Sequence, residues 1–314
     1  MSATRQGVDG RALQWMLLLC VIWGLQQVAI KLAAPDMAPL VQVGLRSGIA
    51  AVLLALFMLW RRQPLGLGDG TLRAGLLVGT LFALEFFFVA EGLRHSSAAH
   101  IVVLLYTAPI FAALGLHLRL PSERLRPLQW LGIVLAFAGI VLAFAGGLLG
   151  PQISSTVLLG DLFGLLAGMS WGALTVSVRC SRLSEAPAAK TLLYQLVCGC
   201  VWLLLAAWLG GQTAEIRFTP LVWGNLLFQS VVVAFASYLA WFWLLRRYLA
   251  SGLGVFSFMT PLFGVLFGVL LLDERIDAFF VGGGLLVLFG ISMVSADGWW
   301  RQLLSRGGRL QRDR

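Results

Sequence analysis

The sequence predicts an all-α integral membrane protein with ten transmembrane helices in two inverted five-helix repeats. Hydrophobic residues make up 59% of the 314 residues and charged residues 12%, and the mean hydropathy is +0.89. An ordinary soluble domain has about 45–50% apolar and about 25% charged residues. This excess of apolar side chains, a series of long apolar runs and an internal repeat are the three observations behind the prediction.

Ten apolar runs are long enough to cross a bilayer, since a helix needs about 20 apolar residues to span roughly 30 Å of hydrocarbon. The connections are short and leave no room for a soluble domain. The first run follows Arg5 and Arg11, as a signal peptide would, but it carries Lys31 and lacks a cleavage site, so we expect it to be retained. The runs are 13–33, 38–60, 72–92, 98–118, 127–147, 157–178, 190–210, 220–245, 252–272 and 278–297.

Lysine and arginine residues are concentrated in every second connection, and therefore on one side of the membrane. When residues at the ends of the runs are counted with the adjoining connections, the N-terminus, the even-numbered connections and the C-terminus hold 18 of them, the odd-numbered connections hold 4, and Arg46 alone lies deep within a run. Because basic residues accumulate on the cytoplasmic side, both termini are expected in the cytoplasm. The tail 297–314, with two tryptophans and five arginines, is expected to anchor to anionic lipid. The net charge of +9 follows from this topology and requires no nucleic-acid partner.

The chain contains an internal repeat, because short patterns from its first half return 148 to 152 residues later. Each half, 12–147 and 157–296, holds five runs, and an odd number makes the second half enter the bilayer from the opposite side. Inverted repeats place a binding site near the membrane midplane and allow alternating access. The matched patterns are Trp23-Gly24 with Trp171-Gly172, Thr107-Ala108-Pro109 with Met259-Thr260-Pro261, and Gly132 and Gly139 with Gly283 and Gly290.

These motifs also resemble the EamA family of the drug/metabolite transporter superfamily. The resemblance covers nearly the whole chain as two tandem domains. It implies a ten-helix carrier of the bacterial inner membrane, usually for amino acids or other small metabolites and often an exporter. It rests on the repeated tryptophan-glycine motif, Arg46 in the second run, Tyr106-Thr107-Ala108-Pro109, and the links Ser122-Glu123-Arg124-Leu125 and Asp273-Glu274-Arg275-Ile276.

Uncharged polar and aromatic residues at membrane depth are the candidates for a substrate cavity. Trp23, Gln26 and Gln27 lie on one face of the first helix, and Trp171 and Thr175 on one face of the sixth. Ligand pockets are mostly apolar and aromatic with a few polar groups, as this set is. Hydrogen bonds between helices would account for some members without any ligand. The set is Trp23, Gln26, Gln27, Tyr106, Trp171, Thr175, Tyr194, Gln195, Asn225, Gln229 and Tyr238.

Glu85 and Arg46 are charged residues within predicted spans, where an ionisable side chain costs a few kcal/mol and faces a cavity or a partner. Glu85 lies in the third run, and its counterpart in the second half is the neutral Ser237. One hypothesis is that Glu85 binds and releases a proton and so couples transport to a proton gradient. The alternative is that Glu85 is a permanent partner of Arg46.

Prolines and glycines predict where the helices break and where they pack closely. Pro109 and Pro261 interrupt the fourth and ninth runs at matched positions, and matched helix breaks point to a transport site. A simple packing kink is the alternative. Gly164, Gly168 and Gly172 predict close packing within the bundle, with a homodimer interface as the alternative, so we expect a monomer or a homodimer.

The sequence lacks the signals of other classes of protein. No cluster has metal-ligand spacing and no P-loop motif is present, so we expect no cofactor and no ATP-driven pumping. The acidic residues Asp273, Glu274 and Asp277 lie on the predicted outer side, unlike the metal-diphosphate sites of intramembrane transferases, so we expect no enzyme. We predict a secondary transporter that exports a small molecule, an amino acid or a related compound. The alternative is a flippase or an export subunit for a lipid-linked substrate.

Overall fold

The fold was analysed in a computed structural model that describes residues 9–63, 66, 68–121, 124–149, 155–248, 253 and 256–310. Side chains are described in these ranges except at 144–149, 245–246 and 295–310. Every element of four or more residues in these ranges is a helix, which confirms the predicted all-α class. The helices are α1 (Gly10–Ala33), α2 (Pro39–Trp60), α3 (Leu72–His95), α4 (Ala98–Leu105), α5 (Ala108–Arg119), α6 (Pro127–Leu149), α7 (Ser155–Arg179), the short η2 (Arg182–Ser184), α8 (Ala188–Leu209), α9 (Pro220–Leu227), the π-helical η3 (Phe228–Ser237), α10 (Tyr238–Arg247), α12 (Met259–Leu272) and α13 (Ala278–Leu310).

Seven helical segments are long and apolar enough to cross a membrane, judged by length and composition. They are α1, α2, α3, α4 with α5, α7, α8, and the continuous segment from α9 into α10. Three further apolar helices are shorter in their described parts: Pro127–Ala143, Met259–Leu272 and Ala278–Val294. Each of these segments overlaps one of the apolar runs identified in the sequence. The chain is therefore a multi-pass helical membrane protein.

Two of the predicted helices are irregular. The fourth run is divided, because α4 ends at Leu105, α5 begins at Ala108, and Tyr106 and Thr107 form a turn between them. The eighth run changes from α-helix to π-helix at Phe228 and back to α-helix after Ser237. π-Helical turns are rare and occur frequently at functional sites. Both irregularities lie near the middle of the membrane-spanning segments.

The outward faces of the helices are apolar, as a lipid environment requires. On α2, the side chains of Val52, Leu56 and Trp60 are 60%, 58% and 75% exposed, and they form one stripe four residues apart. On its opposite face, Ala50 and Leu54 are fully buried. A soluble helix would carry polar residues on the exposed face. Both faces of α2 are apolar, and this is favourable only if the exposed face contacts hydrocarbon rather than water.

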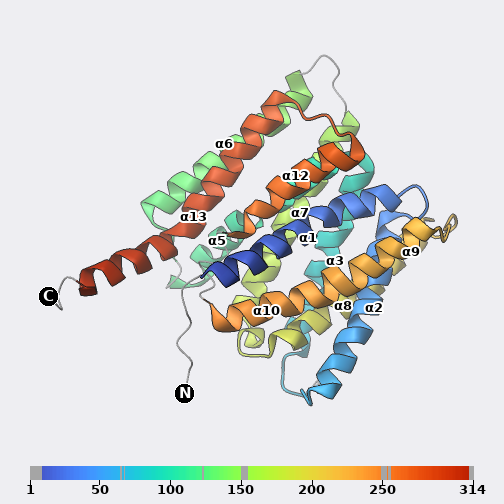
Figure 1. Cartoon of the computed structure of the whole chain (residues 1–314), viewed down its shortest axis with the longest axis horizontal. Helices are drawn as coiled ribbons and strands as arrows, with labels where there is room; N and C mark the ends of the chain where they lie inside the picture. Colours follow the sequence, from blue (N-terminus) through green and yellow to red (C-terminus); the bar gives the residue numbers. More distant parts are fainter. Residues whose placement is uncertain are drawn as a thin grey trace.

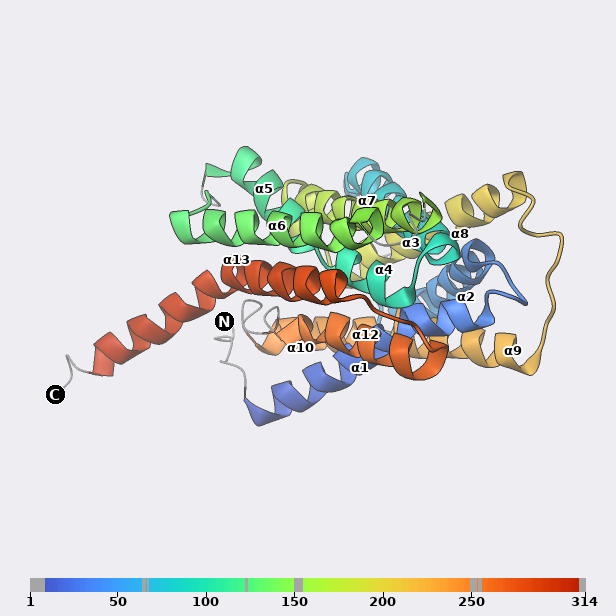
Figure 2. The same ribbon diagram turned by 90° about the horizontal axis from the view of Figure 1, so that it is seen from above.

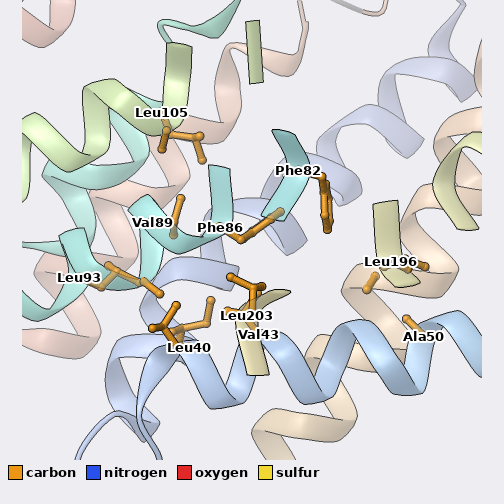
Figure 3. Packing of buried hydrophobic residues seen from close by; sticks show 14 of the residues in the cluster. Leu40, Val43, Ala50, Phe82, Phe86, Val89, Leu93, Leu105, Leu196 and Leu203 are labelled. Carbon is orange, nitrogen blue, oxygen red and sulfur yellow. The ribbon is translucent and has the colours of Figure 1, made fainter. Parts of the chain in front are cut away.

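The core lies between helices from the two halves of the sequence. Figure 3 shows Leu40 of α2 next to Leu93 of α3 and Val43 of α2 next to Leu203 of α8, in the largest cluster of buried hydrophobic residues. Close packing of this kind, rather than the hydrophobic effect alone, holds helices together in lipid. The first and second halves of the chain therefore share one core.

Helix α6 packs against α13 along most of its length, at the edge of the bundle (Figures 1 and 2). Beyond this contact, the last turns of α13 extend away from the bundle (Figure 1). The other closely packed pairs are α1 with α12, α7 with α4 and α5, α3 with α7 and α8, α2 with α8 and η3, and α4 with α12. Every one of these pairs joins the first half of the chain to the second.

The contact between α6 and α13 depends on glycines whose main chains touch. A Cβ atom at Gly290 would lie 2.3 Å from the carbonyl oxygen of Gly132, and one at Gly139 would lie 2.6 Å from that of Gly283. These distances are too short for any side chain. The repeated glycine spacing noticed in the sequence therefore allows two helices to approach backbone to backbone.

Gly290→Ala is expected to lower the stability of the protein by about 1–3 kcal/mol, because the added methyl group forces the two helices apart. The measurement is the thermal unfolding midpoint of the purified protein in detergent. Gly282→Ala is the matched control on the same helix, because its Cβ would meet only the side chain of Leu142 at 3.5 Å. Equal midpoints for the two variants would contradict the proposed contact.

Candidate functional site

A cavity of about 750 Å³ lies among the helices and is called the central cavity below. Its lining comes from α1, α3, α4, α5, α7, α8 and α10, together with the link between α7 and α8. Of the residues that the sequence singled out, nine line it: Trp23, Gln26, Gln27, Glu85, Tyr106, Trp171, Thr175, Gln195 and Tyr238.

The central cavity has a buried end and an open end. Gln27 and Glu85 are 2% and 6% exposed, so the part that they line is closed off from the surface. Thr175, Arg179 and Ser184 also line the cavity but are exposed, and they lie in the last turns of α7 and in η2. The cavity therefore opens beside the link between α7 and α8.

The tryptophan-glycine motif of α1 serves both the cavity and the packing. Trp23 Nε1 donates a hydrogen bond to Ser237 Oγ at 2.8 Å, and the indole packs edge-on against Trp241 with ring centres 5.8 Å apart. The next residue, Gly24, faces α12, where a Cβ would lie 2.7 Å from Phe263 Cβ. The tryptophan thus lines the cavity while the glycine allows α1 to approach α12.

The second copy of the motif, in α7, has the same division of roles. Trp171 lines the cavity and packs edge-on against Tyr106, with ring centres 5.4 Å apart. A Cβ at Gly172 would lie 2.6 Å from Phe111 Cβ, so the glycine allows α7 to approach α5. A short repeated pattern in the sequence therefore corresponds to equivalent packing in the two halves.

The Glu85 carboxylate lines the buried part of the cavity. No hydrogen bond or ion pair joins it to another residue in the described chain, although the guanidinium of Arg46 is near enough to attract it. Its counterpart Ser237 is engaged, because its hydroxyl donates to the carbonyl oxygen of Val233 at 2.6 Å and accepts from Trp23. Glu85 is thus the buried charged group that faces open space in the cavity.

Arg46 is not among the cavity-lining residues and is 1% exposed. Its Nη1 donates to Gln229 Oε1 at 2.8 Å, and Gln229 Nε2 donates to the carbonyl oxygen of Gln26 at 2.9 Å. The guanidinium also lies 4.3 Å from the centre of the Phe86 ring. Arg46 and Gln229 therefore tie α2, η3 and α1 together behind the cavity wall.

Three of the residues predicted for the cavity lie elsewhere, in contacts between helices. The Tyr194 hydroxyl is 3.1 Å from Thr71 Oγ1, and Asn225 Nδ2 donates to Gln42 Oε1 at 2.6 Å. Gln229 bonds Arg46 as described. Each finds a protein partner at membrane depth, which is the role that interhelical hydrogen bonds would give it.

The two prolines flank the cavity without lining it. Pro109 is the second residue of α5, directly after the turn at Tyr106 and Thr107. Pro261 is the third residue of α12, after a turn at Phe258. Proline fits the first turn of a helix because it needs no hydrogen-bond donor there. In both cases the break precedes the proline, and at the first one it places Tyr106 on the cavity wall.

Several lining residues were not singled out from the sequence. Phe82 precedes Glu85 by three residues on α3, and Trp241 and Phe242 follow Tyr238 by three and four residues on α10, whereas Phe86 directly follows Glu85. Residues at this spacing share one face of a helix. Extending each polar candidate along its own helical face would have found Phe82, Trp241 and Phe242 but not Phe86.

A group of polar contacts lies beyond the buried end, where α1 and α3 end and α4 and α7 begin. We call Lys31, Ser96, His100, Asp161 and Glu274 the distal cluster. Glu274 accepts hydrogen bonds from the main-chain nitrogens of Ala98 and Ala99 at 2.6 and 3.0 Å, and it pairs with Lys31 at 3.4 Å.

The rest of the distal cluster centres on Asp161. Its Oδ1 accepts a hydrogen bond from Ser96 Oγ at 2.5 Å and lies 2.9 Å from His100 Nδ1. Lys31 Nζ also donates to the carbonyl oxygen of Ser96. Both acidic residues come from the second half of the sequence and bind groups of the first half. The distal cluster therefore holds the two halves together on the side where the cavity is closed.

The opposite end carries a contact between the link before α3 and the first turn of α8. Lys190 Nζ donates to Asp69 Oδ2 at 2.5 Å and to the carbonyl oxygen of Gly66. The Lys190 ammonium group and the hydroxyl and main-chain nitrogen of Thr71 hold the pKa of Asp69 below its usual range. This contact joins the halves at the open end of the cavity.

Comparison with known proteins agrees with these observations. The EamA-like transporter family matches residues 10–145 and 158–296. A Bacillus subtilis (strain 168) protein named "Uncharacterized transporter YoaV" is 27% identical over 88% of this chain and 94% of its own length. A "Probable amino-acid metabolite efflux pump" from Escherichia coli (strain K12) is 27% identical over 93% of this chain and 97% of its own. A solved crystal structure with 19% identity covers 94% of this chain and 99% of its own, with a TM-score of 0.63.

A multi-pass helical bundle with a cavity between its helices is the architecture of a membrane transporter for small molecules. The chain belongs to the EamA-like transporter family, which confirms the resemblance found in the sequence. The names of its relatives describe transporters rather than enzymes. The solved structure, at its low identity, supports the fold alone.

Proposed function

We propose that this protein is a secondary transporter that exports a small metabolite, an amino acid or a related compound, across the bacterial inner membrane. The observation that carries the proposal is the central cavity, which lies among the membrane-spanning helices and opens beside the link between α7 and α8. Two relatives named as probable amino-acid metabolite efflux pumps support the substrate class and the direction.

The proposal includes an architecture of ten membrane helices in two inverted repeats, 12–147 and 157–296, followed by the cytoplasmic tail 297–314. Two arguments support it. The family pattern matches once in each half. Equivalent helices of the two halves also pack in equivalent ways. Helix α1 corresponds to α7, and α4 with α5 corresponds to α12. Accordingly, α1 packs on α12, and α7 packs on α4 and α5. The side chains of the tail lie outside the described residues.

Alternating access follows from this symmetry. The open end of the cavity lies beside Arg179 and Arg182, among the connections that hold most of the basic residues. Because basic loops stay in the cytoplasm, we assign the open end and both termini to the cytoplasmic side. The distal cluster then closes the outer side. Export would require the residues of the distal cluster to separate while the helices around the contact between Lys190 and Asp69 move together and close the cytoplasmic end.

Glu85 is the proposed coupling residue. A carboxylate in a buried cavity can bind a proton from one side and release it to the other as the cavity changes its opening. Its lack of a fixed partner in the described structure supports this role over that of a permanent partner of Arg46. The gradient of protons would then drive export.

Uptake of radiolabelled amino acids and their metabolites into everted membrane vesicles tests the proposed function. Gln195→Trp, which places an indole in the cavity wall of α8, is expected to reduce uptake at least about tenfold by filling the site. Val201→Trp is the matched control, because Val201 is on the same helix and 55% exposed toward lipid. Equal uptake by both variants would contradict the cavity as the route. Uptake of no compound by the wild-type protein would favour a lipid-linked substrate instead.

A further inference from the structure

The buried end of the central cavity combines one carboxylate with several aromatic rings. Glu85 is the acidic residue of the lining and is 6% exposed. Four rings line the cavity from α1 and α10 and from the turn before α5, and Phe86 directly follows Glu85 on α3. These aromatic lining residues are Trp23, Phe86, Tyr106, Tyr238 and Trp241.

Neither of the two arginines near the cavity exposes its charge at this end. Arg179 is the basic residue of the lining, and it lies eight residues beyond Trp171 on α7, which is about 12 Å along a helix. Arg179 is also engaged in an interaction of its own. Arg46 lies outside the lining, packed on the Phe86 ring and hydrogen-bonded to Gln229. The Arg46 guanidinium is near enough to attract Glu85, but it is 1% exposed and lies outside the lining, so it cannot contact a carboxylate of a molecule seated at the buried end.

We propose that the central cavity selects organic amines that carry an apolar ring and lack a free carboxylate. The proposal rests on the proposed transport function and narrows its substrate class from amino acids and related compounds to the related amines. An ammonium group would pair with Glu85 and lie near aromatic faces, which attract cations. The apolar body would pack against the remaining rings, and the cavity volume leaves room for a group larger than an amino-acid side chain.

A zwitterionic amino acid fits this end less well. Its ammonium group would reach Glu85, but its carboxylate would then enter a buried region that exposes no cation to pair with it, because Arg46 lies behind the cavity wall. An unpaired charge in such a place is strongly disfavoured. The same physical reason excludes carboxylic acids with the same ring. The charge pattern of the cavity therefore separates compounds of equal size and shape by their charge.

Equilibrium binding of four phenyl compounds to the purified full chain in lipid nanodiscs tests the proposal. The compounds are phenethylamine, phenylalanine, hydrocinnamate and phenethyl alcohol, which share one ring and differ in charge. Titration calorimetry at neutral pH is expected to show phenethylamine binding about tenfold or more tightly than the other three, the scale of one charge-assisted hydrogen bond.

Glu85→Gln is expected to weaken phenethylamine binding about tenfold, to the level of phenethyl alcohol, and to leave binding of the alcohol unchanged. Glu91→Gln is the matched control on the same helix. The Glu91 carboxylate is outside the lining and already binds Arg94 at 2.7 Å and Gln212 at 2.9 Å, so this variant should keep the preference for the amine. Size-exclusion chromatography confirms that both variants remain folded.

The outcomes separate this proposal from the transport function. Equal or tighter binding of phenylalanine or hydrocinnamate, a preference for the amine that survives Glu85→Gln, or binding of none of the four compounds would overturn the proposed substrate class. Vesicle uptake of amino acids alongside such a result would leave the transport function intact. Amine binding that depends on Glu85, without uptake of any compound, would support the proposed class and contradict transport.

Discussion

Glu85→Gln is expected to reduce proton-driven uptake to the level of vesicles without the protein. The amide has nearly the size of the carboxylate but cannot take up or release a proton, so coupling to the gradient would be lost. Glu85 makes no hydrogen bond or ion pair in the described structure, and the variant should therefore fold and insert normally. The measurement is uptake into everted vesicles with and without a proton gradient.

A second assay separates coupling from substrate movement. Exchange of labelled for unlabelled substrate needs no gradient and should continue in Glu85→Gln when the substrate is present at saturating concentration. Glu91→Gln provides the control, since it removes a carboxylate from the same helix but outside the cavity. Gradient-driven uptake at the wild-type rate in Glu85→Gln would return Glu85 to a structural role.

Glu274→Ala is expected to open the central cavity toward the outer side. The substitution removes two hydrogen bonds to the main chain of α4 and the ion pair with Lys31. Hydrogen bonds to a charged group contribute about 1.5–3 kcal/mol each, so their loss should shift the balance toward the outward-open state by about tenfold or more. The contacts of Asp161 remain and keep the variant folded.

Thiol labelling from outside the cell measures this shift. A cysteine at Gln27, in a chain whose four natural cysteines are replaced, reports on the buried end of the cavity. Its labelling by a membrane-impermeant reagent should rise about tenfold or more in Glu274→Ala. Asp277→Asn is the control, since Asp277 lies in the same link but caps its own helix at the main-chain nitrogen of Phe280. A rise of equal size in the control would contradict a gating role for Glu274.

Composition and the length of the apolar runs were sufficient to predict a helical membrane protein, because a bilayer allows few alternatives to an apolar helix. The predicted runs also locate the helices closely, for example 72–92 against α3 at Leu72–His95. The family could be recognised from short motifs because their glycines and tryptophans meet strict packing demands. Gly24 and Gly172 illustrate this, since neither position has space for a Cβ atom.

The candidate site could be predicted only in part. Helical periodicity placed Trp23, Gln26 and Gln27 on one face, and all three line the cavity. Periodicity could not distinguish these residues from Tyr194 and Asn225, which are equally polar and equally deep but bind neighbouring helices. The difference depends on which helix stands opposite, and the sequence of a single helix does not contain that information.

The sequence by itself determined the helical membrane class, the positions of the apolar segments, the duplicated motifs and the family. These properties depend on each segment and its exchange with lipid, so local composition and spacing are enough. Only the tertiary structure decided that Arg46 binds Gln229, that Glu85 faces the cavity and that Glu274 reaches the start of α4. Each of these facts depends on contacts between helices that are far apart in the sequence, and in lipid such contacts arise from detailed packing rather than from hydrophobicity.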